Sequence, residues 1–330
     1  MRYFVTGGTG FIGRHLVAKL LGEGHEIVAL ARHPSAAREL LGSGVRIHEG
    51  DVTIKESMHE GMKEVDGVFH LAGWYRIGAK DTSEAEHVNV GGTRNVLELM
   101  RELSIPKGVY TSSLAVFGDT QGRTVDERHR HEGAWLSVYD RTKWAAHFRV
   151  AEAMMRDGLP LVIVQPGVVY GPGDRSLVRS FLVEYLRGKV RIVPRGTTYC
   201  WAHVEDVAQA HVLAMDKGVP GEVYITAGPA ATLRQVLTIA ETISGIPAPR
   251  YNAPAWTMRA LATVMRAVER GRDVPERYAA EALRVAAGVT CLGNSKKAAR
   301  ALGWTARPLD EGLRDTLHEE MRLLGMVPRG

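Results

Sequence analysis

The sequence has few cysteines, no long apolar segment and no metal-ligand motif. Cys200 and Cys291 are the only cysteines among 330 residues, which excludes a disulfide-rich scaffold and a cysteine-rich metal site. No stretch reaches 18 apolar residues without a charge, so we expect no membrane span. The first residues show no apolar leader segment, and we expect a cytoplasmic protein. Thirteen histidines show no zinc-ligand spacing, so we expect no metal.

The charge balance of the chain is also mild. Forty-two Lys and Arg residues and 37 Asp and Glu residues give a net charge of +5. No basic run with interleaved aromatic residues occurs, and we therefore expect no nucleic acid partner. Hydrophobic residues make up 45% and charged residues 24% of the chain, as in globular proteins. The length predicts roughly two domains.

Strand-like and helix-like segments alternate in the first half of the chain. Short, apolar, β-rich segments occur at 2–6, 26–31, 45–49, 65–71, 109–112 and 161–165. Helical periodicity occurs at 13–21, 82–103 and 139–157. This alternation predicts an α/β protein with a Rossmann-type, doubly wound parallel sheet. Such sheets bind ligands outside the carboxyl ends of their strands.

A glycine-rich turn lies between the first predicted strand and the first predicted helix. Gly7, Gly10 and Gly13 are three residues apart in the segment TGGTGFIG. Glycines permit a tight turn and a close approach to a pyrophosphate, and the N–H groups of a helix N-terminus favour anions. We therefore predict that these glycines, with Phe11 and Ile12, bind a dinucleotide.

The end of the second predicted strand bears on the choice of dinucleotide. NAD sites usually place an acid about 20 residues beyond the glycine turn, where it binds the ribose 2′-hydroxyl. Here Ala31 and Arg32 occupy that region, and an arginine is suited to a 2′-phosphate. The sequence favours NADP(H), and NAD(H) stays possible.

A serine, a tyrosine and a lysine form the candidate catalytic set. Ser112 and Ser113 end the strand at 109–112, and Tyr139 and Lys143 share one face of the following helix. The lysine charge favours a tyrosinate, so Tyr139 can exchange a proton with a carbonyl–alcohol pair. A serine hydroxyl can hold the substrate oxygen as its charge changes.

These motifs together resemble one enzyme family. The chain looks like an extended short-chain dehydrogenase/reductase, a group that includes NAD-dependent epimerase/dehydratases and dihydroflavonol-reductase-like enzymes. The matching stretches keep one order up to about residue 317: TGGTGFIG, GDV, HLAG, NVGGT, TSSLAVFG, YDRTK, PGVVYGPG, HVEDVA and LGW. The resemblance implies further cofactor contacts, at the adenine from Asp51 and Val52, at the pyrophosphate from Leu71, Ala72 and Gly73, and at the nicotinamide from Pro166 and Val169. Alignment of TSSLAVFG places Ser113, rather than Ser112, in the catalytic position.

The resemblance also implies a domain division and an assembly. A dinucleotide-binding domain would comprise residues 1–166 and about 201–227. A substrate-binding domain would comprise about 167–200 and 228–330, with helices at 233–244 and 275–287. Members of the family commonly pair as homodimers through helices that match 84–103 and 139–157, and we expect a homodimer. The candidate substrate residues are Trp74, Tyr75, Leu114, Tyr199 and Trp201.

Three functions are compatible with these motifs. The first is reversible carbonyl reduction of a small organic substrate, and the second is epimerisation or dehydration of a nucleotide sugar. The third is a non-catalytic dinucleotide-binding regulator, which would not need Ser113, Tyr139 and Lys143. Nucleotide-sugar enzymes of the family usually carry Asn and Arg where this chain has Val168 and Tyr199, which favours an apolar substrate. Arg284 has a spacing similar to that of a phosphate-binding arginine, but its neighbours do not match, and we interpret it as a helix-face residue.

One further segment permits two interpretations. Between Ala255 and Arg272, apolar residues follow one helical face and arginines follow another. Such a helix can lie on a membrane surface. We favour the alternative that it packs on its own domain.

Overall fold

A parallel sheet forms the centre of the larger part of the molecule. The computed structural model describes residues 1–327. The main sheet has seven strands in the order β10-β6-β5-β4-β1-β2-β3, and all neighbouring strands are parallel. The strand bounds are β1 Arg2–Thr6, β2 Glu26–Ala31, β3 Val45–Glu49, β4 Gly67–His70, β5 Gly108–Thr111, β6 Leu161–Pro166 and β10 Val223–Thr226. The order reverses between β1 and β4, where such sheets bind their ligands. The predicted doubly wound α/β fold is confirmed.

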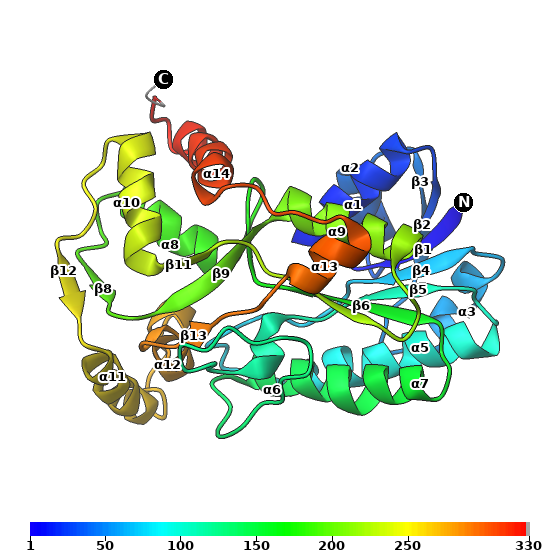
Figure 1. Cartoon of the computed structure of the whole chain (residues 1–330), viewed down its shortest axis with the longest axis horizontal. Helices are drawn as coiled ribbons and strands as arrows, with labels where there is room; N and C mark the ends of the chain where they lie inside the picture. The colour runs from blue at the N-terminus through cyan, green and yellow to red at the C-terminus, as the bar shows by residue number, and fades with distance from the viewer. Residues whose placement is uncertain (328–330) are drawn as a thin grey trace.

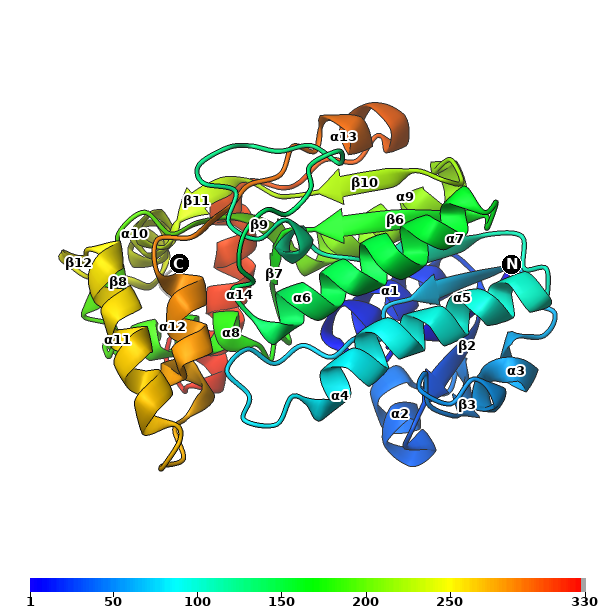
Figure 2. The same ribbon diagram turned by 90° about the horizontal axis from the view of Figure 1, so that it is seen from below.

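Helices cover both faces of this sheet (Figures 1 and 2). Tyr3 and Val5 of β1 pack in the core beneath α1 and α9, whereas Phe4 packs in the core on the opposite face with α3 and α5. This alternation follows from the two-residue period of a strand. The helices around the sheet are α1 Phe11–Gly22, α2 Pro34–Leu41, α3 Glu56–Met62, α4 Ser83–Glu86, α5 Thr93–Glu102, α6 Val138–Trp144, α7 Glu152–Arg156, α9 Val204–Lys217 and α13 Lys296–Leu302.

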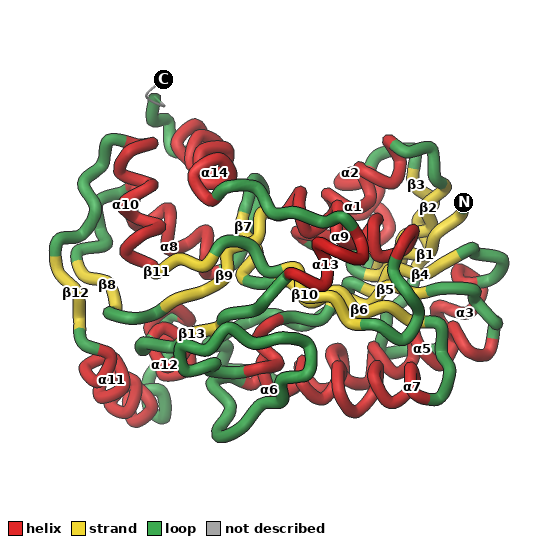
Figure 3. The backbone as a smooth tube through the Cα atoms, in the orientation of Figure 1, coloured by secondary structure: helices red, strands yellow, loops and turns green. Residues whose placement is uncertain are grey.

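The smaller lobe consists of short strands and the remaining helices, and Figure 3 shows it beside the main sheet. A four-stranded sheet has the order β11-β9-β13 with β7 also paired to β9, and β12 pairs with β8. Its strands are β7 Val168–Tyr170, β8 Ile192–Pro194, β9 Thr198–His203, β11 Ala230–Thr232, β12 Tyr251–Ala253 and β13 Thr290–Cys291. Its helices are α8 Leu177–Leu186, α10 Leu233–Ser244, α11 Ala255–Val268, α12 Ala280–Ala286 and α14 Leu309–Leu323.

The helices differ from the sequence-based expectations in two ways. Both long helices contain π-helical turns, at His87–Gly92 and at Ala145–Ala151. The prediction of one continuous helix at 275–287 is wrong. Ala279 has an extended ψ of 147° and separates the 3₁₀ turn Glu276–Tyr278 from α12. Within residues 1–327, no helix is long and apolar enough to cross a membrane.

Candidate active site

The turn between β1 and α1 leaves no space for a side chain at Gly7 or Gly13. Gly7 has a φ of +70°, and a Cβ atom there would lie 2.6 Å from a backbone nitrogen of the segment after β4. A Cβ atom on Gly13 would lie 2.1 Å from the carbonyl oxygen of Gly7. Gly10 is the N-cap residue of α1 and supplies no side-chain acceptor to the first helical N–H groups, those of Phe11 and Ile12. The turn and the helix N-terminus therefore suit an anionic ligand.

A cation and an anion lie together where β2 and β3 end. The exposed Arg32 guanidinium has its Nε atom 4.0 Å from Oδ2 of Asp51. The other carboxylate oxygen of Asp51 accepts hydrogen bonds from the backbone and hydroxyl of Thr53, both at 2.8 Å. Val52 is buried, and a Cβ atom on Gly92 would lie only 2.8 Å from its side chain. Asp51 and Val52 are thus fixed, whereas the Arg32 side chain is largely exposed beside Asp51.

A buried chain of hydrogen bonds lies beside the glycine turn. The Nδ1 atom of His70 is 2.7 Å from Oγ1 of Thr6, and its Nε2 atom is 3.0 Å from Oγ1 of Thr93. Burial lowers the pKa of His70 to about 3, so the ring is neutral at physiological pH. Thr6 Oγ1 also accepts the N–H of Ala72 at 3.2 Å. This chain fixes the 71–73 segment next to the turn.

The three candidate catalytic side chains lie together at the carboxyl edge of the sheet. Lys143 is buried, and its Nζ atom donates to the carbonyl of Thr111 at 2.8 Å and to the hydroxyl of Tyr110 at 3.0 Å. Burial raises the pKa of Tyr139, while the Lys143 charge and a hydrogen bond with Ser113 act in the opposite direction. Burial likewise lowers the pKa of Lys143, and Tyr139 opposes that effect. Both partners thus favour release of the Tyr139 proton, which a general acid–base residue requires.

The two adjacent serines have different surroundings. The hydroxyl of Ser112 is buried 2.7 Å from Nδ1 of His147, whose Nε2 atom lies 3.4 Å from Glu152. The hydroxyl of Ser113 accepts the N–H of Ala115 at 3.1 Å and lies close enough to Tyr139 to lower the pKa of that phenol. The geometry therefore favours Ser113 as the serine that reaches a substrate.

Two of the candidate substrate residues follow β4. Tyr75 is 44% exposed, and its ring meets that of Tyr139 edge-on with 4.8 Å between the centroids. Trp74 is buried, and its backbone exchanges two hydrogen bonds with the Asn89 side chain, at 2.8 and 3.1 Å. Tyr75 is thus the aromatic residue of this segment that lies against the catalytic tyrosine.

The other three candidate substrate residues lie deeper. Leu114 is buried in the core where the main sheet meets the smaller lobe. Trp201 is buried in the core of the smaller lobe, and its indole N–H donates to the carbonyl of Ala231 at 3.0 Å. Tyr199 is half-buried, and its hydroxyl donates to the carbonyl of Val285 at 2.7 Å. The bonded and fully buried indole of Trp201 serves the packing of the smaller lobe.

Two carboxyl groups that the sequence analysis did not single out lie at the seam between the larger part and the smaller lobe. Glu281 of α12 accepts the N–H of Gly78 at 2.6 Å and that of Val138 at 2.5 Å. Asp140 is buried next to Tyr139, and burial raises its pKa to about 7, with the Glu281 charge acting in the same direction. The partners of Glu281 are 203 and 143 residues distant in the chain, so no local pattern could have revealed it.

The arrangement at the carboxyl edge fits a dinucleotide. The open N-terminus of α1 suits a pyrophosphate and Arg32 suits a ribose phosphate. Pro166 ends β6, and Val169 lies in β7 opposite Ala202. These are the residues that would hold the cofactor.

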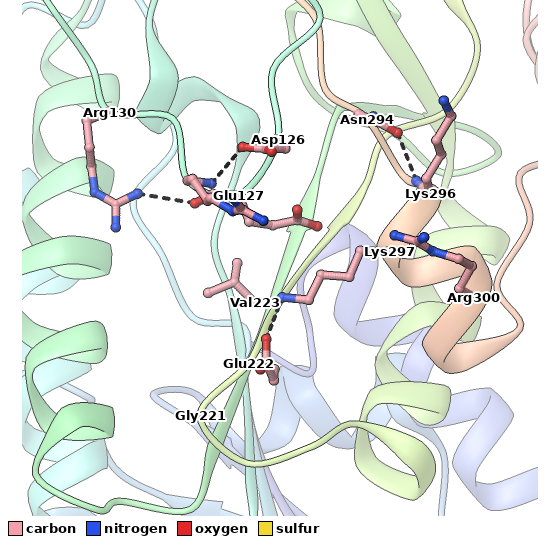
Figure 4. A pocket seen from close by; sticks show the side chains of 11 residues that line it. Asp126, Glu127, Arg130, Gly221, Glu222, Val223, Asn294, Lys296, Lys297 and Arg300 are labelled. Carbon is pink, nitrogen blue, oxygen red and sulfur yellow. Dashed lines mark hydrogen bonds and ion pairs between the residues drawn. The ribbon is translucent and has the colours of Figure 1, made fainter.

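A separate hollow lies away from these residues (Figure 4). It has a volume of about 560 Å³ and is lined by the 126–130 loop, the start of β10 and α13. Lys297 forms an ion pair there with Glu222 at 2.5 Å. None of the predicted site residues lines it, and we assign it no part in the chemistry.

Comparisons with known proteins agree with this geometry. Residues 3–227 match the family model described as the NAD dependent epimerase/dehydratase family. A 4-hydroxy-2-methyl-3-oxo-4-farnesyl-3,4-dihydroquinoline-1-oxide ketoreductase from Stigmatella aurantiaca is 34% identical over 97% of this chain and 96% of its own length. Sterol demethylase protein B from Methylococcus capsulatus is 32% identical over 84% of each chain.

Solved structures give the same result. The structure of MoeE5 in complex with UDP-glucuronic acid and NAD has a TM-score of 0.76 and 28% identity, covering 98% of this chain and 100% of that one. The chain therefore belongs to the NAD dependent epimerase/dehydratase family, which confirms the resemblance to extended short-chain dehydrogenases/reductases. It is an NAD(P)-dependent enzyme of that type, so the non-catalytic regulator is not supported.

Proposed function

We propose that this enzyme is an NADP(H)-dependent oxidoreductase that interconverts a carbonyl group and an alcohol in a small, largely apolar organic substrate. The observation that carries the proposal is that Lys143, anchored on Thr111 at the end of β5, and Ser113 both lie near enough to Tyr139 to lower its pKa. Arg32 at the end of β2 supports NADP(H). The names of the two relatives, a ketoreductase and a sterol demethylase protein, support an apolar substrate.

The catalytic side chains have distinct parts in this reaction. A nicotinamide cofactor, when bound, would supply the hydride-transfer chemistry of this site. Tyr139 donates its hydroxyl proton to the carbonyl oxygen in reduction and takes a proton from the alcohol in oxidation. The Lys143 ammonium stabilises the tyrosinate that reduction leaves, and Ser113 donates a hydrogen bond to the substrate oxygen.

A nucleotide-sugar epimerase or dehydratase is the second candidate, because the similar MoeE5 structure contains UDP-glucuronic acid and NAD. Two positions speak against it. Val168 offers no donor, and the Tyr199 hydroxyl already donates to the carbonyl of Val285. Arg284 lies with its Nε atom 3.5 Å from the carbonyl of Leu136, which suits a residue bonded within the fold.

One experiment separates these candidates. The purified protein is mixed with NADPH and with ketones of increasing apolar size, and the loss of NADPH absorbance is followed. In parallel, the NADP-bound protein is titrated calorimetrically with UDP, GDP and dTDP. We expect turnover of apolar ketones and no nucleotide binding. A micromolar dissociation constant for any of the nucleotides, without ketone turnover, would replace the oxidoreductase by the epimerase.

The division of the chain into two domains belongs to the same proposal. The dinucleotide-binding domain would comprise 1–166 and about 201–227, and the substrate-binding domain about 167–200 and 228–330. The chain course supports the first part of this division, because α9 and β10 return to the main sheet after β9 of the smaller lobe. Helix α13, which falls in the proposed substrate-binding range, packs on the main sheet as well. The homodimer through 84–103 and 139–157 also stays a proposal.

A further inference from the structure

Helix α11 presents apolar side chains to solvent on the outer edge of the smaller lobe. Ala262 is the only buried residue among its 14 residues. Trp256 is 69% exposed, Val264 59% and Leu261 45%. Figures 1 and 2 show α11 at the periphery, packed against α12. The expectation that this segment packs on its own domain accounts for the face of Ala262, where Met258, Met265 and Val268 are half-buried, and leaves the opposite face to solvent.

The exposed apolar residues form a stripe with helical spacing. Trp256, Ala260 and Val264 are four residues apart, so they lie one above another on the helix. At 100° per residue, this stripe points away from buried Ala262, which contacts the lobe. A tryptophan and a valine on the solvent side of a lobe helix mark an interaction surface.

The charge of this segment is strongly positive. Residues 250–272 contain five arginines and one glutamate, a net +4 in a chain whose total is +5. The glutamate, Glu269, accepts the backbone N–H of Ala280 at 2.6 Å. Arg259, Arg266 and Arg270 are exposed, and none of them forms an ion pair with a carboxylate among residues 1–327.

We propose that α11 binds the surface of an anionic lipid membrane. The stripe of Trp256, Ala260 and Val264 enters the boundary between headgroups and acyl chains, and the arginines beside it meet lipid phosphates. Tryptophan favours this boundary because it has an apolar body and a polar N–H group. A second copy of the chain is a poorer occupant, because two such faces would bring uncompensated arginines together.

The position of α11 gives this binding a consequence for the enzyme. Helix α11 packs on α12, and α12 carries Glu281, which bonds the backbone directly before Tyr139. Membrane binding would therefore place the smaller lobe, and the seam beside the site, close to a source of apolar substrate. The membrane proposal does not depend on the proposed function, because its test measures binding and not turnover.

The test is co-sedimentation of the full-length protein with vesicles. Vesicles of phosphatidylcholine alone are compared with vesicles that contain one third phosphatidylglycerol, at low and high salt. We expect binding to the anionic vesicles that weakens at high salt. Arg259→Gln and Arg266→Gln together should weaken it about 25-fold, since each arginine near the surface contributes about fivefold. Trp256→Ser with Val264→Ser should weaken it at least about tenfold.

Matched controls separate this face from the rest of the surface. Leu323→Ser removes an exposed apolar residue of α14, and Arg300→Gln removes an exposed charge of α13; both should bind vesicles like the wild type. Circular dichroism and NADPH affinity confirm that each variant is folded. The absence of vesicle binding, equal binding to neutral vesicles, or equal loss in the controls would overturn the proposal. Light scattering that shows a lipid-independent dimer lost in the Trp256 variant would assign the face to a second copy instead.

Discussion

The carboxyl edge of the main sheet and the smaller lobe are built differently. At the sheet edge, strands of four to six residues are almost wholly buried, and their polar ends are bonded in chains such as Thr6–His70–Thr93. Apart from β9, the strands of the smaller lobe have only two or three residues, as in β11, β12 and β13. Its helix α11 has a single buried residue. In the proposed function, the reaction chemistry belongs to the buried sheet edge and substrate recognition to the smaller lobe. Five substitutions test this division.

Tyr139→Phe should have the largest effect. Loss of the hydroxyl removes the proton path, and turnover should fall by about 10²–10⁴-fold. The dissociation constant of NADPH should change little, because the ring remains. Steady-state kinetics with a fluorescence titration of NADPH measures both. Tyr75→Phe, which removes a neighbouring hydroxyl, serves as the control. An equal loss of turnover in Tyr75→Phe would contradict the assignment of Tyr139 as the proton donor.

Asp140→Asn tests the buried carboxyl group between the main sheet and the smaller lobe. The folded protein holds a proton on Asp140 up to a pKa of about 7, whereas the unfolded chain releases it near pH 4. Wild-type stability should therefore fall as pH rises through this window, by at most about 4 kcal/mol. The variant should lack this contribution. Urea unfolding at about pH 4.5 and about pH 8 measures the difference, and parallel pH profiles would contradict the buried protonated state.

Gly13→Ala tests the rigidity of the sheet edge. The added Cβ atom would lie 2.1 Å from the Gly7 carbonyl oxygen, so the turn must distort. We expect NADPH affinity to fall about 100-fold, since the pyrophosphate then loses several backbone contacts. Gly22→Ala in the same helix is the control, because a Cβ atom there meets nothing within 4 Å. Unchanged affinity in Gly13→Ala would show that the turn tolerates more than its geometry indicates.

Arg32→Gln should affect one cofactor only. Loss of a charged hydrogen bond to the 2′-phosphate should weaken NADPH binding about tenfold or more and leave NADH binding unchanged. Arg46→Gln on the exposed side of β3 controls for the lost charge. Calorimetric titration with both cofactors is the measurement. Equal affinities of the wild type for NADPH and NADH would refute the NADP(H) preference.

Tyr199→Phe should have the smallest effect and probes the smaller lobe. It removes one hydrogen bond, to the carbonyl of Val285, which contributes about 1 kcal/mol to stability. We expect a change of a few fold in the KM of the ketone and no change in NADPH affinity. Tyr251→Phe on an exposed strand is the control. A change in NADPH affinity as large as that of Arg32→Gln would contradict the assignment of cofactor binding to the main sheet alone.

Local sequence patterns determined the parts of this protein that depend on near neighbours. Alternating strands and helices predicted the parallel sheet, the glycine spacing predicted a turn in which Gly7 has a positive φ, and the four-residue interval set Tyr139 and Lys143 on one helix face. The family resemblance pointed to Ser113, and the tertiary structure supplied the physical reason in the burial of Ser112 against His147.

Only the tertiary structure decided the features that join distant segments. Composition marks Trp201 and Trp256 equally as aromatic, yet one is sealed in the lobe core and the other faces solvent. Glu281 looks like an ordinary helix-surface acid until α12 is placed against Gly78 and Val138. Periodicity reports which residues share a face of one element, and it carries no information about whether another element covers that face.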